Sequence, residues 1–378
     1  MKVRVKNSVL QKMLKDVNQV KGGRADTLPI LGFVKAKADE HGLSLLKTNL
    51  AISVERKELE GVTVEKEGEC LIPAAVFEGA VSNMGEFVEI SYLKSKGKKV
   101  LLSDENVNYE LFSMPVDDYP DEIKLKKEEI SIAMSGSLFL NKFRDVWIAC
   151  SRDDSRKALN GVYAEIAEET INMAATDGKR LCAHEESLEE IKHAEKAVIP
   201  KKEGLEEVAK IMLSCEPEDI EFKTDKALAC ICFSGCVISF KLIDGNYPDW
   251  RQIVPDKYDC DVNLDSGELC SALKAVSVID PQYVIFSINN QSIAIAGDNT
   301  ANGHCDGVIP CTGEIKKPTV IKFHIDYILS YLAKIPEGQV NMKFASEDMA
   351  PVQFDSEGLR YWIMPLRIES QTSAEENK

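Results

Sequence analysis

The sequence of 378 residues lacks any run of 18 apolar residues, so it predicts no membrane-spanning helix. It also lacks a recognisable secretory signal, because residues Met1 to Lys6 alternate charged residues with valine, as a strand does, and contain no apolar core. Eleven cysteines in a chain without such a signal indicate reduced thiols, and we expect a cytoplasmic protein.

Sequence signatures of catalysis are missing as well. Neither GxxxxGK[ST] nor GxSxG occurs, and the five histidines have no diagnostic spacing from a serine or cysteine nucleophile. The segment Asp177–Arg180 is similar to the end of the KxDGxR signature of nucleotidyl transferases, but Ala175 replaces the nucleophilic lysine. We therefore disfavour the alternative of a tandem-domain enzyme acting on nucleotides. We interpret the segment as a tight turn, in which Asp177 accepts backbone hydrogen bonds and Gly178 takes an unusual backbone angle.

A metal site is not expected either. Cys230, Cys232 and Cys236 are close in sequence, but they lie in a strand-like apolar run and no second CxxC or HxxxH pair follows. We interpret them as small core residues and predict no metal and no cofactor.

Positive charge is scarce in the chain as a whole, because 46 Lys and Arg residues stand against 62 Asp and Glu residues, a net charge of −16. This balance argues against a protein coated by nucleic acid. The first 24 residues nevertheless carry seven basic residues against a single acid, Asp16. A basic surface on an acidic protein disfavours the further alternative, an acidic interaction scaffold that never meets DNA.

What the sequence does contain is an internal repeat with a period of a little over 120 residues. Segment Leu46–Leu50 returns as Ala174–Gly178 at an offset of 128, and more faintly as Ala296–Asn299. Asp118–Asp121 returns as Asn246–Asp249 at the same offset of 128. Repeats in register at several points indicate one domain copied three times. We place the domains at 1–127, 128–256 and 257–370, followed by a polar, disordered tail at 371–378.

Each repeat predicts two helices and several antiparallel strands, an α+β fold with the helices packed on the sheets. Apolar residues at helical spacing predict six helices, at Asn7–Val20, Pro73–Met84, Ser137–Cys150, Glu203–Cys215, Ser266–Val278 and His324–Ala333. In the first, Asn7 is the expected cap. In the second, we expect Val76, Phe77, Ala80, Val81 and Met84 to be buried.

Two copies of this chain have enough helices to surround DNA. A helix is roughly 10 Å across, so twelve helices lining a closed ring would span a circumference of about 120 Å. The hole would be on the order of 35–40 Å wide, which admits a duplex with a sleeve of water. Three domains form half of such a ring, and a second copy would close it.

Five motifs occur in the order found in bacterial sliding clamps: Thr27–Leu31, Leu159–Gly161, Thr176–Leu181, Asp244–Asp249 and Met364–Arg367. From Met1 to about Ile368 the chain resembles this family, the beta subunits of DNA polymerase III. The resemblance implies a head-to-tail homodimeric ring around duplex DNA that is not an enzyme. Such a ring tethers the replicative polymerase for processive synthesis and is opened by a separate clamp loader.

The resemblance also implies contacts with DNA that are independent of sequence, because phosphate contacts position a protein without specifying bases. The basic residues expected to line the hole are Lys12, Lys15, Arg24, Lys142, Arg152, Arg156, Lys201 and Lys202.

A cleft between the second and third domains is implied as the site for a short linear peptide of the polymerase, the clamp loader, repair polymerases and other partners. The matching positions are Leu159, Thr176, Gly178, Lys179, Arg180, Leu181, Pro248, Ile253, Met349, Val352, Trp362, Ile363, Met364, Pro365, Leu366 and Arg367. Three positions differ from the usual family residues: Lys179 replaces a frequent histidine, Gln252 a residue that can be arginine, and Trp362 a smaller aliphatic. The preferred peptide therefore stays open.

For the joint between two copies, the resemblance points to Tyr109 and Leu111 on a strand of the first domain. They are expected to meet Val278 and Ile279, at the end of a helix in the third domain of the other copy. Pairing of edge strands across this joint would continue the sheet.

Overall fold

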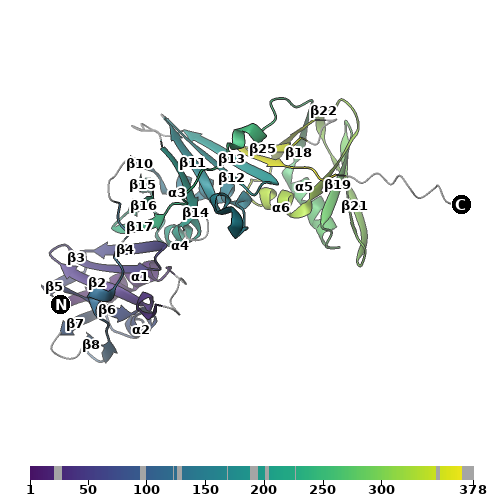
Figure 1. Cartoon of the computed structure of the whole chain (residues 1–378). Helices are drawn as coiled ribbons and strands as arrows, with labels where there is room; N and C mark the ends of the chain where they lie inside the picture. Colours follow the sequence, from purple (N-terminus) through teal and green to yellow (C-terminus); the bar gives the residue numbers. More distant parts are fainter. Residues whose placement is uncertain are drawn as a thin grey trace. The chain divides into compact units, whose positions relative to one another are not determined.

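The computed structural model describes residues 1–20, 28–93, 99–121, 123–125, 130–167, 169–187, 195–200, 204–225, 227–345 and 350–367 (Figure 1). Within these residues, none of the helices is both long enough and apolar enough to span a membrane. The α-helices are α1 (Asn7–Val17), α2 (Ala74–Val81), α3 (Gly136–Val146), α4 (Glu206–Cys215), α5 (Ser266–Ser277) and α6 (Ile325–Leu332).

The strands form antiparallel sheets, and two of these lie in the first half of the chain. The five-stranded sheet has the order β5 (Val62–Lys66), β1 (Lys2–Lys6), β7 (Phe87–Leu93), β8 (Lys99–Ser103), β9 (Asn108–Phe112). The eight-stranded sheet has the order β10 (Ile130–Ser135), β15 (Asp219–Thr224), β16 (Leu228–Phe233), β17 (Cys236–Lys241), β4 (Ile52–Glu58), β3 (Gly42–Thr48), β2 (Phe33–Asp39), β6 (Gly68–Pro73).

The remaining strands complete the second and third repeats. One sheet contains the series β11 (Gly161–Ala167), β12 (Thr170–Thr176), β13 (Arg180–Ser187), β26 (Leu359–Ile363), β25 (Val352–Ser356), β24 (Gln339–Phe344), β18 (Cys260–Asp265), β22 (Thr312–Glu314). The four-stranded sheet has the order β21 (Gly303–Pro310), β20 (Ser292–Asn299), β19 (Tyr283–Ile288), β23 (Thr319–His324). A further strand is β14 (Glu195–Pro200). Mixed helix and sheet confirm the predicted α+β class.

The chain forms two compact units, and the middle repeat contributes to both. The first unit comprises Met1–Asn141 and Ile191–Asp244, and the second comprises Lys142–Glu190 and Gly245–Lys378. The three domain boundaries drawn from the sequence stay a prediction. Residue 127 and the tail at 371–378 lie outside the described residues.

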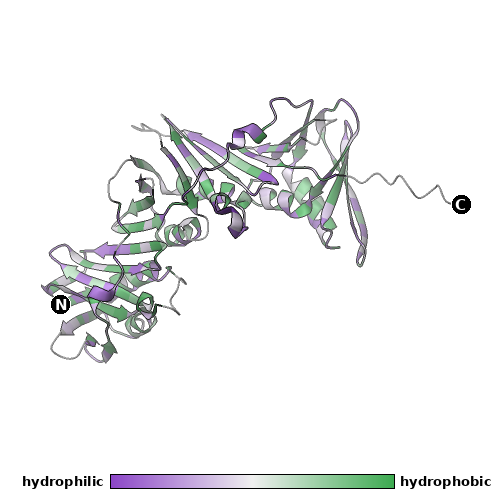
Figure 2. Cartoon of the chain, viewed as in Figure 1, coloured by the Kyte–Doolittle hydropathy of each residue, from purple (hydrophilic) through white to green (hydrophobic). Residues whose placement is uncertain are grey.

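All six predicted helices are present, with ends that differ by a few residues. The apolar stripe of α1 is confirmed, because Leu10, Met13, Leu14 and Val17 are buried (Figure 2 shows the alternation of hydrophobic and hydrophilic residues along the chain). The expectation for Val76 is wrong: it is 50% exposed, because it lies on the outward side of α2, whereas the next residue, Phe77, faces inward and is fully buried.

The predicted capping role of Asn7 is also wrong. Its side chain makes no cap hydrogen bond to α1. Its Nδ2 instead donates to the carbonyl oxygens of Val81, Met84 and Gly85, at 3.1, 2.7 and 2.8 Å. These carbonyls belong to the last residue of α2 and to residues just after the helix, where carbonyl groups have no helical partner. Asn7 therefore joins the beginning of one helix to the end of the other.

Two strand pairings carry the sheets across the repeats. Strand β17 of the second repeat pairs with β4 of the first, with Ile238 opposite Val54. Strand β26 of the third repeat pairs with β13 of the second, with Trp362 opposite Leu181. In both cases the last strand of one repeat joins the strand that follows the first hairpin of the preceding repeat. The repeats are therefore continuous through backbone hydrogen bonds as well as through the chain.

A buried charged cluster lies beside the first of these pairings. Arg56 of β4 donates from Nη1 to the carbonyl of Ser234 at 2.6 Å and from Nη2 to Glu58. Its Nε lies 3.7 Å from Oδ2 of Asp16, and both residues are almost completely buried. The thiol of Cys215 donates to the other oxygen of Asp16 at 3.4 Å. Burial raises the pKa of Asp16 above its usual value, and burial raises the pKa of Cys215 to about 11.

We expect Arg56→Met to lower the free energy of unfolding by about 3 kcal/mol, because removing one member of a buried ion pair leaves the other charge uncompensated. Urea unfolding followed by circular dichroism measures this change. Lys57→Gln, at the exposed neighbouring position on β4, is the matched control and should cost less than about 0.5 kcal/mol. Equal stability of Arg56→Met and the unmodified protein would show that the cluster does not hold this junction.

Candidate partner-peptide site

The segment between β12 and β13 forms the tight turn that its sequence predicts. Oδ1 of Asp177 accepts hydrogen bonds from the backbone N–H of Lys179 and Arg180, at 2.9 and 3.1 Å. Gly178 has a φ of +86°, a conformation that residues with a Cβ rarely adopt. Thr176 is buried, and its Oγ1 donates to the carbonyl of Arg180 at 2.6 Å. The turn is thus fixed by its own side chains.

Arg180 connects this turn to two elements of the third repeat. Its Nε donates to Oδ2 of Asp177 at 2.9 Å. Its Nη1 donates to Oγ of Ser330 on α6 at 3.1 Å and to the hydroxyl of Tyr361 on β26 at 3.3 Å. The guanidinium also lies 4.4 Å from the centre of the Tyr327 ring. This combination of a planar fork with a stacked face is specific to arginine.

The C-terminal motif lies directly beside the turn. The backbone N–H of Met364 donates to the carbonyl of Lys179 at 2.9 Å, which extends the pairing of β13 with β26 by one bond. Two residues later, the N–H of Leu366 donates to the carbonyl of Lys322 on β23 at 2.8 Å. The two sequence motifs that the resemblance placed in one site, 176–181 and 362–367, are therefore neighbours.

A buried apolar cluster packs against the residues of this site. It contains Trp362, Trp250 and Leu181, together with two alanines that leave room for the indole rings. Trp362 is 2% exposed, and its Nε1 donates to the hydroxyl of Tyr258 at 2.9 Å. Burial of a tryptophan with its N–H satisfied stabilises the packing without leaving an unpaired donor.

The sixteen proposed peptide contacts differ in exposure. Buried members are Leu159, Thr176, Leu181, Val352, Trp362 and Ile363, whereas Met364 and Ile253 are 39% and 40% exposed. The other exposed or half-buried members are Gly178, Lys179, Arg180, Pro248, Pro365, Leu366 and Arg367. None of the hydrogen bonds described above involves Leu159 or Pro248. Met349 lies outside the described residues.

Four tyrosines contribute contacts here that the sequence analysis does not assign to the site. Tyr247 accepts the N–H of Thr176 at 3.0 Å, and burial raises its pKa, so the hydroxyl stays neutral. The repeat of Tyr-Pro-Asp at 119–121 and 247–249 is a sequence signal for Tyr247. Tyr258, Tyr327 and Tyr361 carry no such signal, because their contacts join residues that are far apart in sequence.

The proposed DNA contacts are placed only in part. Lys12 and Lys15 are exposed on α1, away from its buried stripe, as expected. Arg152 and Arg156 are exposed, and Lys142 is half-buried with its Nζ 3.9 Å from Glu186. Arg24, Lys201 and Lys202 lie outside the described residues. The role of this group in binding DNA stays a prediction.

The residues proposed for the joint between copies differ in exposure. Val278, which follows α5, is 82% exposed, and Ile279 is half-buried. Tyr109 is half-buried on β9, and Leu111 is buried at 9%. Because side chains alternate along a strand, the outward neighbour of Leu111 is Phe112, which is 76% exposed.

Comparison with protein families gives two matches in the order of the chain. The family models described as the N-terminal and the central domain of the DNA polymerase III beta subunit match residues 1–125 and 133–249. The chain belongs to the DNA polymerase III beta subunit family. Among its relatives, the beta sliding clamp of Vibrio cholerae is 25% identical and covers 97% of this chain and 100% of the relative. The beta sliding clamp of Synechococcus elongatus is 23% identical, and the match covers 90% of this chain and 93% of the relative.

Solved structures of family members have the same fold. The beta subunit of Thermotoga maritima has a TM-score of 0.85 at 22% identity, with 97% of this chain and 99% of that chain covered. The sliding clamp of Bacillus subtilis has a TM-score of 0.88 at 22% identity and the same coverage. The predicted clamp fold is confirmed over nearly the whole chain.

We expect Arg180→Lys to lower the free energy of unfolding by about 1.5–3 kcal/mol, since lysine cannot bond Asp177, Ser330 and Tyr361 together while stacking on Tyr327. Thermal unfolding monitored by calorimetry measures the change. Lys179→Gln, at the exposed neighbouring position in the same turn, is the control and should leave the midpoint where it is. If the two variants behave alike, Arg180 does not join the turn to α6 and β26.

Proposed function

We propose that this protein is a sliding clamp, a ring of two head-to-tail copies that encircles duplex DNA and tethers the replicative polymerase. The observation that carries this proposal is the repeated strand junction, in a chain of the DNA polymerase III beta subunit family. The fourth strand of each repeat is the one that can pair with a strand of the following repeat. These strands are β4, β13 and β21. The last strand of each repeat is the one that can pair with the preceding repeat. These strands are β9, β17 and β26.

Two of the three possible junctions are formed within the chain, and one of each kind of strand is left over. β17 pairs with β4, and β26 pairs with β13. β21 is at the edge of the four-stranded sheet, and β9 is at the edge of the five-stranded sheet. The third junction, β9 of one copy against β21 of another, would repeat the other two and close the ring.

Apolar exposure near both free edges supports such a joint. Phe112 on β9 is 76% exposed, Val308 on β21 is 66% exposed, and Val278 is 82% exposed. Exposed side chains of this size favour burial against a partner. We therefore keep Tyr109, Leu111, Val278 and Ile279 as proposed contacts and add Phe112, whose side chain points outward.

DNA would be held by topology, with weak contacts that permit sliding. A few lysines and arginines suffice for this, because phosphate contacts carry no sequence information. The proposed lining includes Lys12 and Lys15 on the exposed side of α1 and Arg152 and Arg156. The chain as a whole has a net charge of −16, which would keep DNA from adhering elsewhere.

The proposed partner cleft is the site built from the turn 176–181 and the motif 362–367. Exposed Met364 and Ile253 would supply apolar anchors, and the ordered turn would supply backbone groups, as peptide capture requires. The polymerase, the clamp loader and repair polymerases are the proposed partners. Family membership favours this function over the tandem-domain enzyme. The cytoplasmic location stays a prediction.

Topological binding has a direct test. The protein is loaded by a clamp loader onto nicked circular DNA, and the complex is isolated by gel filtration in moderate salt. We expect the protein to stay on the circle and to leave once a restriction enzyme linearises the DNA, because only an end lets a closed ring slide off. Equal loss from circular and linear DNA would contradict encirclement.

For the partner cleft, we expect Met364→Ala combined with Leu366→Ala to weaken binding of a polymerase clamp-motif peptide by about ten- to a hundredfold, through the loss of two apolar contacts. Fluorescence anisotropy of a labelled peptide measures the affinity. Mass in solution should stay that of the dimer.

The matched control is Leu59→Ala, since Leu59 is also exposed, at 64%, but belongs to the first unit. Peptide affinity that is the same in the double variant and the control would place the cleft elsewhere. A persistent monomer of the unmodified protein at micromolar concentration would count against the ring.

A further inference from the structure

A cavity of about 450 Å³ lies in the second repeat, where α3 begins and α4 ends, and we call it the α3–α4 cavity. Both helices join the paired strands β10 and β15 at the same end, since Ser135 of β10 lies opposite Asp219 of β15. Its volume is within the range of about 300–1,000 Å³ of small-ligand pockets. Its lining belongs to the first unit, whereas the proposed partner cleft belongs to the second.

The walls of the α3–α4 cavity are joined through the backbone. The N–H of Gly136, at the start of α3, donates to the carbonyl of Glu218 at 2.8 Å. A Cβ at position 136 would lie 2.3 Å from the carbonyl oxygen of Pro217, so only glycine permits this close approach. The last turn of α4 is closed by the N–H of Glu216, which donates to the carbonyl of Met212 at 2.7 Å. The cavity is therefore preformed, and a ligand does not have to order its walls.

The lining of this cavity offers apolar side chains from both helices. Met212 of α4 is 1% exposed, and Leu140 of α3 is half-buried. Leu213, in the last turn of α4, is 54% exposed. A single exposed leucine is ordinary on a protein surface, but this one lines a concave apolar site, which is what an apolar side chain of a partner requires.

The charges at the cavity have one sign. Its lining, as the structure describes it, has two charged residues, Glu216 and Glu218, and both are exposed. Within the described part of the chain, neither carboxylate has an ion pair or a hydrogen bond. The surrounding segment 206–221 contains six acidic residues and a single lysine, Lys210, which pairs with Glu207 at 2.8 Å. The cavity therefore favours a cationic ligand.

The helix ends at the cavity are compatible with a cation. α4 ends there, and its last carbonyls carry partial negative charge. Its last turn, which the structure describes in full, contains no basic residue that would cancel this charge. α3 begins there, but its first donors are already occupied. The N–H of Gly136 donates to the carbonyl of Glu218, and the N–H of Leu138 donates to Oγ of Ser135 at 3.5 Å.

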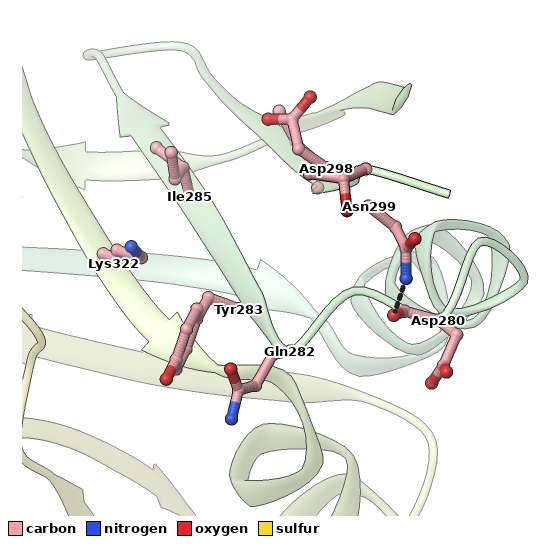
Figure 3. A pocket seen from close by; sticks show the side chains of 10 residues that line it. Asp280, Gln282, Tyr283, Ile285, Asp298, Asn299 and Lys322 are labelled. Carbon is pink, nitrogen blue, oxygen red and sulfur yellow. Dashed lines mark hydrogen bonds between the residues drawn. The ribbon is translucent and has the colours of Figure 1, made fainter. Parts of the chain in front are cut away.

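The cavity of about 330 Å³ on the four-stranded sheet differs in this respect. Figure 3 shows that it is lined by Asp280 and Asp298 as well as by Lys322. Asp298 is moreover paired with His304 at 2.7 Å. With both signs of charge in its lining, that cavity selects neither a cationic nor an anionic ligand.

We propose that the α3–α4 cavity is a docking site for a basic segment of a partner protein. The segment inserts an apolar side chain beside Leu213 and places lysine or arginine side chains against Glu216 and Glu218. The stems of these basic side chains can cover apolar surface while their charged ends reach the rim. DNA does not fit, because the same carboxylates repel its phosphates. This inference goes beyond the proposed function, since the cavity and the partner cleft share no residue.

The test uses the full-length protein with ¹³C-labelled methionine methyl groups, which NMR spectroscopy observes directly. Met212 reports on the cavity and Met364 on the proposed cleft, and replacing each with leucine assigns its signal. The probes are three blocked peptides, Gly-Leu-Leu-Lys-Lys-Gly, Gly-Leu-Leu-Glu-Glu-Gly and Gly-Ser-Ser-Lys-Lys-Gly, and a short DNA duplex. Titration of each probe gives its affinity.

We expect the Leu-Leu-Lys-Lys peptide to shift the Met212 signal and to bind about fivefold or more tightly than the other two peptides, because it alone supplies both apolar side chains and cations. Leu213→Ser should weaken this binding about three- to tenfold. Glu216→Gln combined with Glu218→Gln should remove the preference for Lys-Lys over Glu-Glu.

The matched control is Leu59→Ser combined with Glu60→Gln. These residues are also an exposed leucine and an exposed glutamate of the first unit, but they lie outside the lining of the cavity. The control variant should keep both the affinity and the preference.

Three results would overturn the docking site. The first is a Met212 signal that responds to none of the peptides at millimolar concentration, or to all three alike. The second is a preference for Lys-Lys that survives the double glutamate variant. The third is a shift of Met212 by the DNA duplex, which assigns the cavity to DNA. The proposed clamp function is tested separately, by retention on circular DNA, and does not depend on these outcomes.

Discussion

The constraint on which the rest of this structure depends is the pairing of strands across repeats. A β-sheet edge exposes unpaired N–H and C=O groups, and a repeat with two such edges must either protect them or pair them. Here the edges are paired, β17 with β4 and β26 with β13. The backbone ladder fixes the register, since a slip of one residue would turn every buried side chain outward. Strands β9 and β21 lie at sheet edges in the positions that correspond to these junctions, and we propose that a second copy pairs with them.

Each internal junction adds an arginine to the ladder, but the two junctions serve different purposes. At the first, Arg56 is buried with Asp16 and bonds the carbonyl of Ser234, so the charges are enclosed and no surface is left for a partner. At the second, Arg180 is only partly buried, and Asp177, Tyr361 and Tyr327 orient it beside exposed Met364. Copies of one domain thus form a closed joint in one place and, in the other, a partly exposed surface that we propose as the partner cleft.

Much of this could be predicted from sequence, because it depends on neighbours along the chain. Helical periodicity located all six helices, and the turn at Asp177 and Gly178 follows from local hydrogen bonding and backbone freedom. What the sequence did not reveal depends on distant contacts. The sequence predicts Asn7 as a helix cap, yet its side-chain amide donates hydrogen bonds to carbonyls more than seventy residues away, where α2 ends. The partner of Arg56 at Ser234 is 178 residues distant, and no spacing rule predicts it.

A row of stacked side chains runs from Arg180 of the proposed cleft through Tyr327, His324 and Tyr283 to Lys322. A clamp that serves several partners needs a common anchor of modest strength, and neighbouring contacts can then rank the partners. Each of these rings packs on the next, which restricts their rotation. A preorganised surface loses little entropy of its own when a partner segment binds to it. Partner binding through side-chain contacts is therefore compatible with weak contacts to DNA, because the proposed ring holds DNA by topology.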